Sequence, residues 1–199
     1  MTLPAFAEAP VVAALGDSLT AGYGLQTADG FVPQLQDWLA GQGIAVELRN
    51  AGVSGDTTAG GLSRVDWTLT PDVDGMIVAL GGNDYLRGFD PALVRQNLQG
   101  ILDVARDKGV PVMLIGLQVG NNYGPDYKAA FDAVYADLAA AYDVPLVPGF
   151  FAGMRKATQG GPLTPYMQGD GIHPTAEGVA LNVAEIGPAV ADFITGLDE

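Results

Sequence analysis

Residues 10–24 read PVVAALGDSLTAGYG, and this stretch decides the fold. The apolar run from Val11 to Leu15 is too short for a buried helix but has the length of a fully buried strand. Gly16, Asp17 and Ser18 then break the pattern with one residue that tolerates positive φ and two that cap or turn the backbone. Open α/β sheets bind ligands beyond the carboxyl ends of their strands. Ser18 is therefore either a candidate nucleophile or, with Asp17, an ordinary helix cap.

Four more short apolar or alternating runs are separated by helical patterns along the chain. The expected strands cover residues 44–48, 76–80, 111–117 and 144–147, and the expected helices cover residues 31–40, 59–69, 91–108, 126–142 and 174–195. Gly187 and Pro188 are expected to kink or divide the last helix. No repeat or linker interrupts the alternation. The sequence thus predicts a single α/β domain over residues 10–199, with a five-stranded parallel sheet covered on both faces.

Composition argues against several classes of function. Nine Lys and Arg face 23 Asp and Glu, a formal net charge of −14, which disfavours binding to nucleic acid or to an anionic membrane surface. The chain has one His and no Cys, and it lacks a complete dinucleotide fingerprint or P-loop, so we expect no metal and no cofactor. No apolar stretch approaches the roughly 20 residues of a spanning helix, so no integral membrane segment is expected.

The first nine residues allow two interpretations. Residues 1–7, MTLPAFA, are too short to hold the apolar region of a secretory signal, yet Ala5-Phe6-Ala7 has the small-x-small pattern of a cleavage site. Residues 1–9 are either an ordinary flexible N-terminus or the remnant of a trimmed export signal. The first interpretation is compatible with a cytoplasmic protein, and the second predicts a periplasmic or secreted one.

His173 is the single histidine, so serine chemistry with a histidine base has only this base available. A serine hydroxyl needs a neighbouring base, and a carboxylate on the other ring nitrogen orients that base. Asp170 lies three residues upstream, and Gly171 gives the turn between them conformational freedom. Pro174 is predicted at the first helical position, which places His173 near the helix N-cap. The alternative is that Asp170 and His173 are ordinary polar residues of a helix entry.

Acyl transfer also needs hydrogen-bond donors for the oxyanion. Gly55 offers an unobstructed backbone N–H and Asn83 a side-chain amide, each in a glycine-rich loop after the second and third strands. Both residue types are also common in turns and caps. Leu19 and Tyr23 are interpreted as packing residues. Four loops together supply the groups that a serine hydrolase requires.

Four sequence blocks occur in an order that resembles the SGNH or GDSL hydrolases. They are Gly16-Asp17-Ser18-Leu19, Ser54-Gly55-Asp56-Thr57, Gly81-Gly82-Asn83-Asp84 and Asp170-Gly171-Ile172-His173-Pro174. The likeness is greatest to the bacterial thioesterase I, lysophospholipase L1 and arylesterase branch. That branch is also resembled at Leu86-Arg87-Gly88, Asn122-Tyr123-Gly124 and Asp143-Val144-Pro145-Leu146.

The resemblance implies a flavodoxin-like three-layer α/β/α sandwich and a catalytic triad of Ser18, Asp170 and His173. It also implies an oxyanion hole formed by the Ser18 N–H, Gly55 and Asn83. We expect a monomeric serine esterase that acts on small acyl esters or thioesters through an acyl-enzyme. The branch is often exported, which favours the signal interpretation of residues 1–9.

The substrate pocket is expected in the loops after the third and fourth strands, with the lining residues Tyr85, Leu86, Leu117 and Tyr123. Within the enzyme class, the alternative is a carbohydrate acetylesterase. From other classes, the alternatives are a flavodoxin-like domain that binds a nucleotide or flavin, and a catalytically silent acidic domain.

Overall fold

The computed structural model describes residues 9–198 and is built around a parallel sheet. Its strands are β1 (Val11–Gly16), β2 (Glu47–Gly52), β3 (Gly75–Ala79), β4 (Val112–Ile115) and β5 (Leu146–Val147). They lie in the order β2-β1-β3-β4-β5, which is the flavodoxin-like order. The predicted five-stranded parallel sheet is confirmed.

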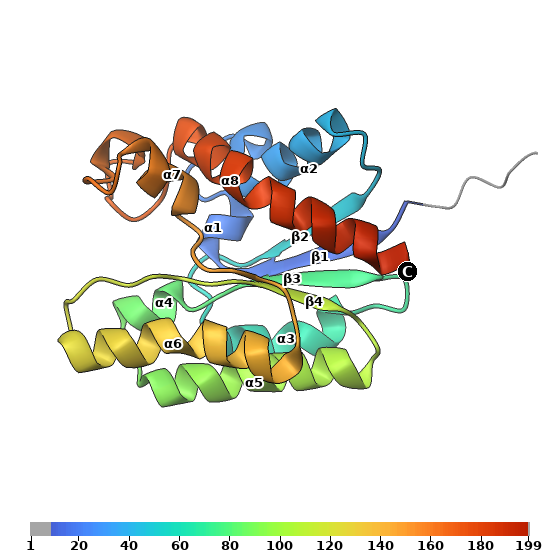
Figure 1. The fold of residues 1–199 in the computed structure, drawn as a ribbon, viewed down its shortest axis with the longest axis horizontal. Coiled ribbons are helices and arrows are strands. Elements are labelled where there is room, and N and C mark those ends of the chain that lie inside the picture. The colour runs from blue at the N-terminus through green and yellow to red at the C-terminus, as the bar shows by residue number, and fades with distance from the viewer. Residues whose placement is uncertain (1–8, 199) are drawn as a thin grey trace, which may run out of the picture.

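Helices cover both faces of the sheet (Figure 1). One layer holds α1 (Ser18–Ala21), α2 (Phe31–Gly41), α7 (Ala152–Ala157) and α8 (Ala176–Thr195). The other holds α3 (Thr58–Thr68), α4 (Gly82–Leu86), α5 (Pro91–Asp107) and α6 (Pro125–Tyr142). The short helices α1, α4 and α7 lie at the end of the sheet away from the C-terminus.

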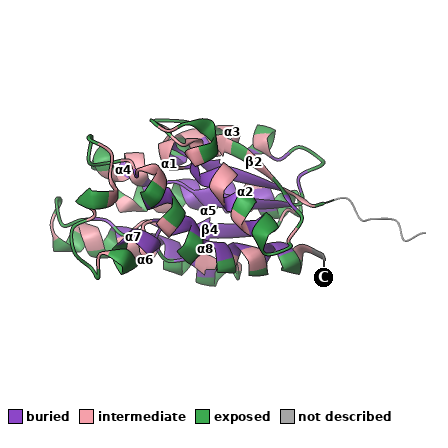
Figure 2. Cartoon of the chain, turned by 90° about the horizontal axis from the view of Figure 1, so that it is seen from above, coloured by how far each residue is buried: buried purple, intermediate pink, exposed green. Residues whose placement is uncertain are grey.

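Each face of the sheet has its own apolar core because β1 is buried on both sides. Val12 and Ala14 pack towards α2 and α8, whereas Ala13 and Leu15 pack towards α3, α5 and α6. This two-sided burial explains the unbroken apolar run in the sequence. Buried residues follow the strands through the middle of the molecule, and exposed residues lie on the outer helix surfaces and loops (Figure 2).

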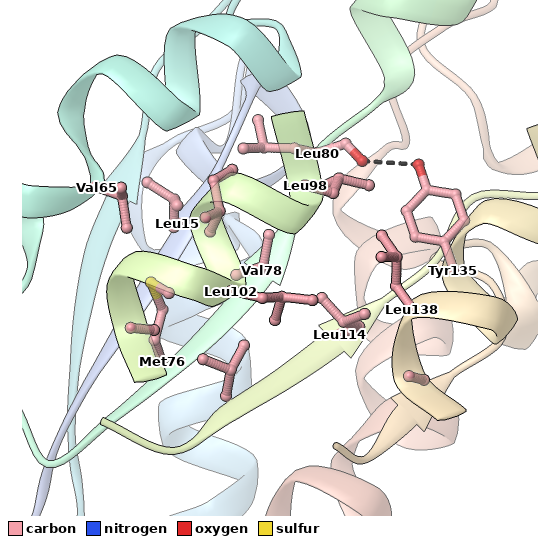
Figure 3. Packing of buried hydrophobic residues seen from close by; sticks show 14 of the residues in the cluster. Leu15, Val65, Met76, Val78, Leu80, Leu98, Leu102, Leu114, Tyr135 and Leu138 are labelled. Atoms are coloured by element: carbon pink, nitrogen blue, oxygen red, sulfur yellow. Dashed lines mark hydrogen bonds between the residues drawn. The ribbon is translucent and has the colours of Figure 1, made fainter. Parts of the chain in front are cut away.

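The apolar core between the sheet and the helices α5 and α6 includes a buried tyrosine whose hydroxyl is hydrogen-bonded (Figure 3). Tyr135 of α6 is buried, and its hydroxyl donates a hydrogen bond of 2.8 Å to the carbonyl of Leu80, just after β3. Burial raises the pKa of this phenol well above its usual value, so it stays protonated as a donor. The bond holds the start of the loop that carries Asn83.

The predicted second strand is displaced from the observed one. Residues 44–48 were expected, whereas β2 spans Glu47–Gly52. β2 is an edge strand, and most of its residues are exposed or half-buried, so apolar alternation does not mark it. It includes Arg49, whose guanidinium pairs with Glu47 and Asp72.

The last helix also differs from the sequence prediction. α8 begins at Ala176 with Thr175 as its N-cap, because the Thr175 hydroxyl accepts the Gly178 N–H. Pro174 instead forms an isolated antiparallel bridge with Met167. The helix is not divided at Gly187-Pro188. A Cβ on Gly187 would lie 2.7 Å from the Trp38 ring, so this glycine permits α8 to pack closely on α2.

Within the described residues, α8 alone is long and apolar enough to cross a membrane by length and composition. The expectation that no apolar stretch approaches that length is therefore wrong. Half of its most apolar window is buried inside the fold, where α8 packs on α2 and α7. Residues 1–8, which carry the Ala5-Phe6-Ala7 motif, lie outside the described residues.

Candidate active site

The carboxyl ends of β1, β2 and β3 surround a cavity of about 410 Å³. Ser18 follows β1, Gly55 follows β2 and Asn83 follows β3, and all three line this cavity together with His173. After β1 the chain runs to one helical layer, and after β3 it runs to the other (Figure 1). This is the topological switch point at which doubly wound sheets bind ligands.

Ser18, His173 and Asp170 form a continuous chain of hydrogen bonds. His173 Nε2 lies 2.8 Å from Ser18 Oγ, and His173 Nδ1 lies 2.6 Å from Asp170 Oδ2. The other carboxylate oxygen, Oδ1, accepts the backbone N–H groups of Ile172 and His173. The hydrogen bond from His173, with these two backbone bonds, holds the pKa of Asp170 well below its usual range. Asp170 is therefore a fixed negative charge beside the imidazole.

The turn that carries Asp170 and His173 is held by backbone geometry rather than by a helix. Gly171 adopts φ +67°, as its position in the turn requires, and His173 lies outside α8, just before its N-cap Thr175. The Gln168 amide nitrogen donates to the carbonyls of Tyr23 and Pro174, and the Gln168 backbone N–H donates to the His173 carbonyl. Gln168 thus ties the histidine turn to the loop after α1.

Ser18, Gly55 and Asn83 line the cavity, and in the described part of the chain the N–H groups of Ser18 and Gly55 and the side-chain amide of Asn83 have no protein acceptor. The loops that carry Gly55 and Asn83 are joined by buried hydrogen bonds, in which Asp84 accepts the Thr58 N–H at 2.9 Å and the Thr58 hydroxyl at 2.6 Å. On the other side, Arg87 Nη2 donates to the Gly55 carbonyl at 2.9 Å. The two loops therefore hold each other in place.

Arg64 of α3 joins the ends of two strands. Its guanidinium donates to the carbonyls of Gly16 and Ala51 at 2.9 and 2.8 Å and to Asp56 Oδ2 at 2.7 Å. The planar fork of arginine can satisfy three acceptors at once. Gly16 precedes the Asp17-Ser18 turn, and Asp56 follows Gly55, so one side chain fixes both loops.

Asp17 is a buried carboxyl directly beside Ser18. It is 2% exposed, and its Oδ1 accepts the Leu19 N–H at 3.0 Å as the N-cap of α1. Burial raises its pKa from the ordinary 3.8 to about 6; the Leu19 bond and His173 oppose this rise, and Asp56 and Asp84 add to it. The sequence reading of Asp17 as a cap is confirmed, but its burial was not foreseen.

The walls of the cavity only partly match the predicted pocket. Tyr85, Leu86 and Leu117 line it, but Tyr123 does not; its ring packs edge-on against Tyr85 with centroids 5.8 Å apart. Leu19 also lines the cavity. Tyr23, interpreted from the sequence as a packing residue, is 53% exposed, lines the cavity and lies with its ring centroid 4.6 Å from that of His173.

Residues 14–181 match the sequence profile of the GDSL-like lipase/acylhydrolase family. The chain belongs to this family. The match spans all four loops that meet at the cavity, and it confirms the predicted resemblance to the SGNH or GDSL hydrolases.

Two named relatives are similar to this chain over most of their length. Esterase TesA of Pseudomonas aeruginosa is 43% identical over 84% of this chain and 81% of the relative. Thioesterase 1/protease 1/lysophospholipase L1 of Escherichia coli K12 is 36% identical over 86% of this chain and 78% of the relative. The crystal structure of AlinE4, an SGNH-hydrolase family esterase, superposes with a TM-score of 0.76 at 43% identity, covering 95% of this chain and 98% of AlinE4.

The sequence prediction missed the wall of the cavity that lies next to the histidine turn. This wall is formed by Phe151, Arg155, Leu163, Met167 and Ile172. The stretch from 149 to 171 is rich in Gly and Pro, a composition typical of an irregular loop, yet it contains α7 and a 3-10 turn at Thr164–Tyr166. Its Gly and Pro content hid both elements. Only the apolar spacing of Phe151 and Met154 within a helical turn offered a signal.

Proposed function

We propose that this chain is a serine esterase that hydrolyses carboxylic esters or thioesters of small to medium acyl chains through an acyl-enzyme. The observation that carries the proposal is the hydrogen-bonded chain from Ser18 Oγ through His173 to Asp170 at the edge of the cavity. Family membership and relatives named esterase and thioesterase support the same reaction class.

In the proposed reaction, Ser18 Oγ attacks the carbonyl carbon while His173 Nε2 takes the hydroxyl proton. The carbonyl oxygen becomes an oxyanion, and the unpaired N–H groups of Ser18 and Gly55 and the amide of Asn83 stabilise it. The tetrahedral intermediate collapses as His173 gives the proton to the leaving oxygen or sulfur. Asp170 keeps the imidazole oriented and stabilises its charged form.

The second half of the reaction repeats these roles with water as the nucleophile. His173 takes a proton from water, the hydroxide attacks the acyl carbon, and the proton returns to Ser18 Oγ as the carboxylic acid leaves. Many of the residues that line the cavity are apolar, among them Leu86, Leu117 and Phe151. Such a surface suits a short hydrocarbon chain.

Replacing Ser18 by Ala tests the proposal. We expect hydrolysis of p-nitrophenyl butyrate to fall by at least about 10³-fold, because a triad without its nucleophile retains only weak catalysis. Far-ultraviolet circular dichroism and the thermal midpoint of Ser18→Ala should match those of the wild type. Ser63, which is exposed on α3 and away from the cavity, provides the matched control as Ser63→Ala. Substantial activity in Ser18→Ala would refute the assignment.

The role of His173 as a base predicts a pH dependence of turnover. Only the neutral imidazole can accept the proton from Ser18. We expect kcat to fall towards acid pH, because protonation of the imidazole removes the base. A value of kcat that is constant from pH 5 to 8, measured with an ester whose own hydrolysis is subtracted, would contradict the role.

We further propose that the protein acts in the periplasm or outside the cell. The proposal is supported by the Ala5-Phe6-Ala7 motif and by the resemblance to an often exported branch. Fractionation of cells that express the gene, followed by mass spectrometry of the N-terminus of the recovered protein, tests it. We also propose that the active form is a monomer, which light scattering during size exclusion tests directly.

A further inference from the structure

Arg155 differs from most of the basic side chains because it forms no ion pair within the described part of the chain. Of the nine Lys and Arg, seven pair with carboxylates, namely Arg49, Arg64, Arg95, Arg106, Lys108, Lys128 and Lys156. In the described part of the chain, only Arg87 and Arg155 have no carboxylate within ion-pair distance. With 23 acidic residues available, two unpaired arginines are unexpected, and both lie beside the cavity.

The two unpaired arginines are placed differently. Arg87 is outside the cavity lining, and its guanidinium is used to hold the Gly55 carbonyl. Arg155 lines the cavity, and in the described part of the chain its guanidinium makes one hydrogen bond, a long contact of 3.3 Å from Nη2 to the Gln118 carbonyl. The remaining N–H groups of Arg155 are therefore available to an incoming ligand. Besides Arg155, the lining contains only His173 and the buried Asp17 as ionisable groups outside its tyrosines.

We infer that Arg155 is an anion-binding residue of the cleft, which selects acyl esters or thioesters carrying a phosphate or carboxylate beyond the scissile bond. A guanidinium presents paired donors that match these oxyanions. In a chain of net charge −14 the surrounding potential repels anions, so one exposed, unpaired arginine gives the local attraction that such a substrate needs. This inference rests on the proposed esterase function.

Lys156 provides a matched control on the same helix. It is the next residue of α7, lies outside the cavity lining and pairs with Glu185 at 2.6 Å. Lys156→Gln removes the same unit of charge as Arg155→Gln but leaves the cavity unchanged. Arg155→Lys keeps the charge and removes the fork, so it reports how far paired hydrogen bonds contribute.

Two pairs of substrates, each differing only by an anionic group, test the inference. The first pair is p-nitrophenyl butyrate and mono-p-nitrophenyl glutarate, which carries a carboxylate at the end of the acyl chain. The second is 2-hydroxyethyl butyrate and its phosphate monoester, which carries the anion on the leaving group. For Arg155→Gln we expect kcat/KM to fall about tenfold on the charged member of at least one pair, mainly through KM. Neutral esters should change less than about twofold.

The pair that responds identifies the side of the scissile bond on which Arg155 acts. An equal loss on neutral and charged esters, an equal loss in Lys156→Gln, or no loss on either charged ester would each overturn the inference. Failure of the proposed function looks different: the wild type would then not hydrolyse the neutral esters, or Ser18→Ala would still do so.

Discussion

At the scale of single residues, Asp17 couples stability to pH. Its pKa rises from 3.8 to about 6 on folding because burial disfavours the charged form. The stabilisation from a raised carboxyl pKa is complete below about pH 3.8 and is lost as the pH rises through about 6. At neutral pH, the ionised buried carboxylate lowers the free energy of unfolding by about 3 kcal/mol relative to low pH.

Asp17→Asn isolates this effect, since an amide oxygen can still accept the Leu19 N–H. As the pH rises from about 4 to 6, the wild type should lose stability relative to Asp17→Asn, because only the wild type ionises a buried carboxyl. The difference in the free energy of unfolding should become constant above about pH 7. Urea titrations of both proteins at intervals from pH 4.5 to 7.5 measure it. A packing difference shifts every pH equally, so a gap that does not change with pH would show that Asp17 titrates alike in both states.

The candidate site could be predicted from the sequence where its residues follow buried strands or stand out by residue type. Ser18 and Asn83 come directly after β1 and β3, which apolar runs mark clearly, and the cavity brings them together. His173 was found because it is the single histidine. Arg155 and Tyr23 were missed because their place in the wall depends on how α7 and the loop after α1 pack, which no local pattern encodes.

At the scale of elements, Arg64 connects β1, β2 and α3 through three hydrogen bonds. Arg64→Lys keeps the positive charge, but an ammonium group cannot match the three acceptors of the fork. We expect a loss of about 2 kcal/mol in the free energy of unfolding, because hydrogen bonds to charged groups are each worth about 1.5–3 kcal/mol and the side chain is 23% exposed. The loops that it holds carry Ser18 and Gly55, so kcat should also fall roughly tenfold.

Arg95→Lys is the matched control for that experiment. Arg95 pairs with Asp137 across the exposed surfaces of α5 and α6, and neither residue lines the cavity. Exposed pairs contribute about 0–1 kcal/mol, so both stability and kcat should stay near wild type. Urea titration and initial rates on one ester measure both variants. Wild-type kcat in Arg64→Lys would show that the hydrogen bonds of the Arg64 guanidinium do not position the site.

An element could be predicted well where its own sequence stabilises it, and poorly where packing against other elements does. Asp90 as N-cap and Pro91 at the first helical position predict the start of α5, and the helix begins there. Gly60 and Gly61 are poor helix formers, but α3 contains both because a Cβ on Gly60 would collide with Asp56 and one on Gly61 with Leu80. The edge strand β2 and the short helices α4 and α7 are fixed by tertiary packing. Their own sequences therefore mark them poorly.

At the scale of the whole molecule, net charge dominates the response to salt. Nine basic groups face 23 acidic ones, and seven of the nine already neutralise carboxylates. The uncompensated acidic groups repel one another and destabilise the compact state. Sodium chloride weakens this repulsion, since the screening length falls from about 30 Å at 0.01 M to well under 10 Å at 0.5 M. The same salt weakens the ion pairs, but exposed pairs contribute at most about 1 kcal/mol each.

Repulsion among the excess carboxylates should therefore outweigh the attraction within the pairs at neutral pH. We expect the thermal midpoint at pH 8 to rise by roughly 4 °C between 10 mM and 500 mM sodium chloride, as measured by differential scanning calorimetry. Near pH 4.5, close to the sequence isoelectric point of about 4.1, the excess charge is largely neutralised and the rise should vanish or reverse. A midpoint that falls with salt at pH 8 would mean that the ion pairs contribute more to stability than the repulsion removes.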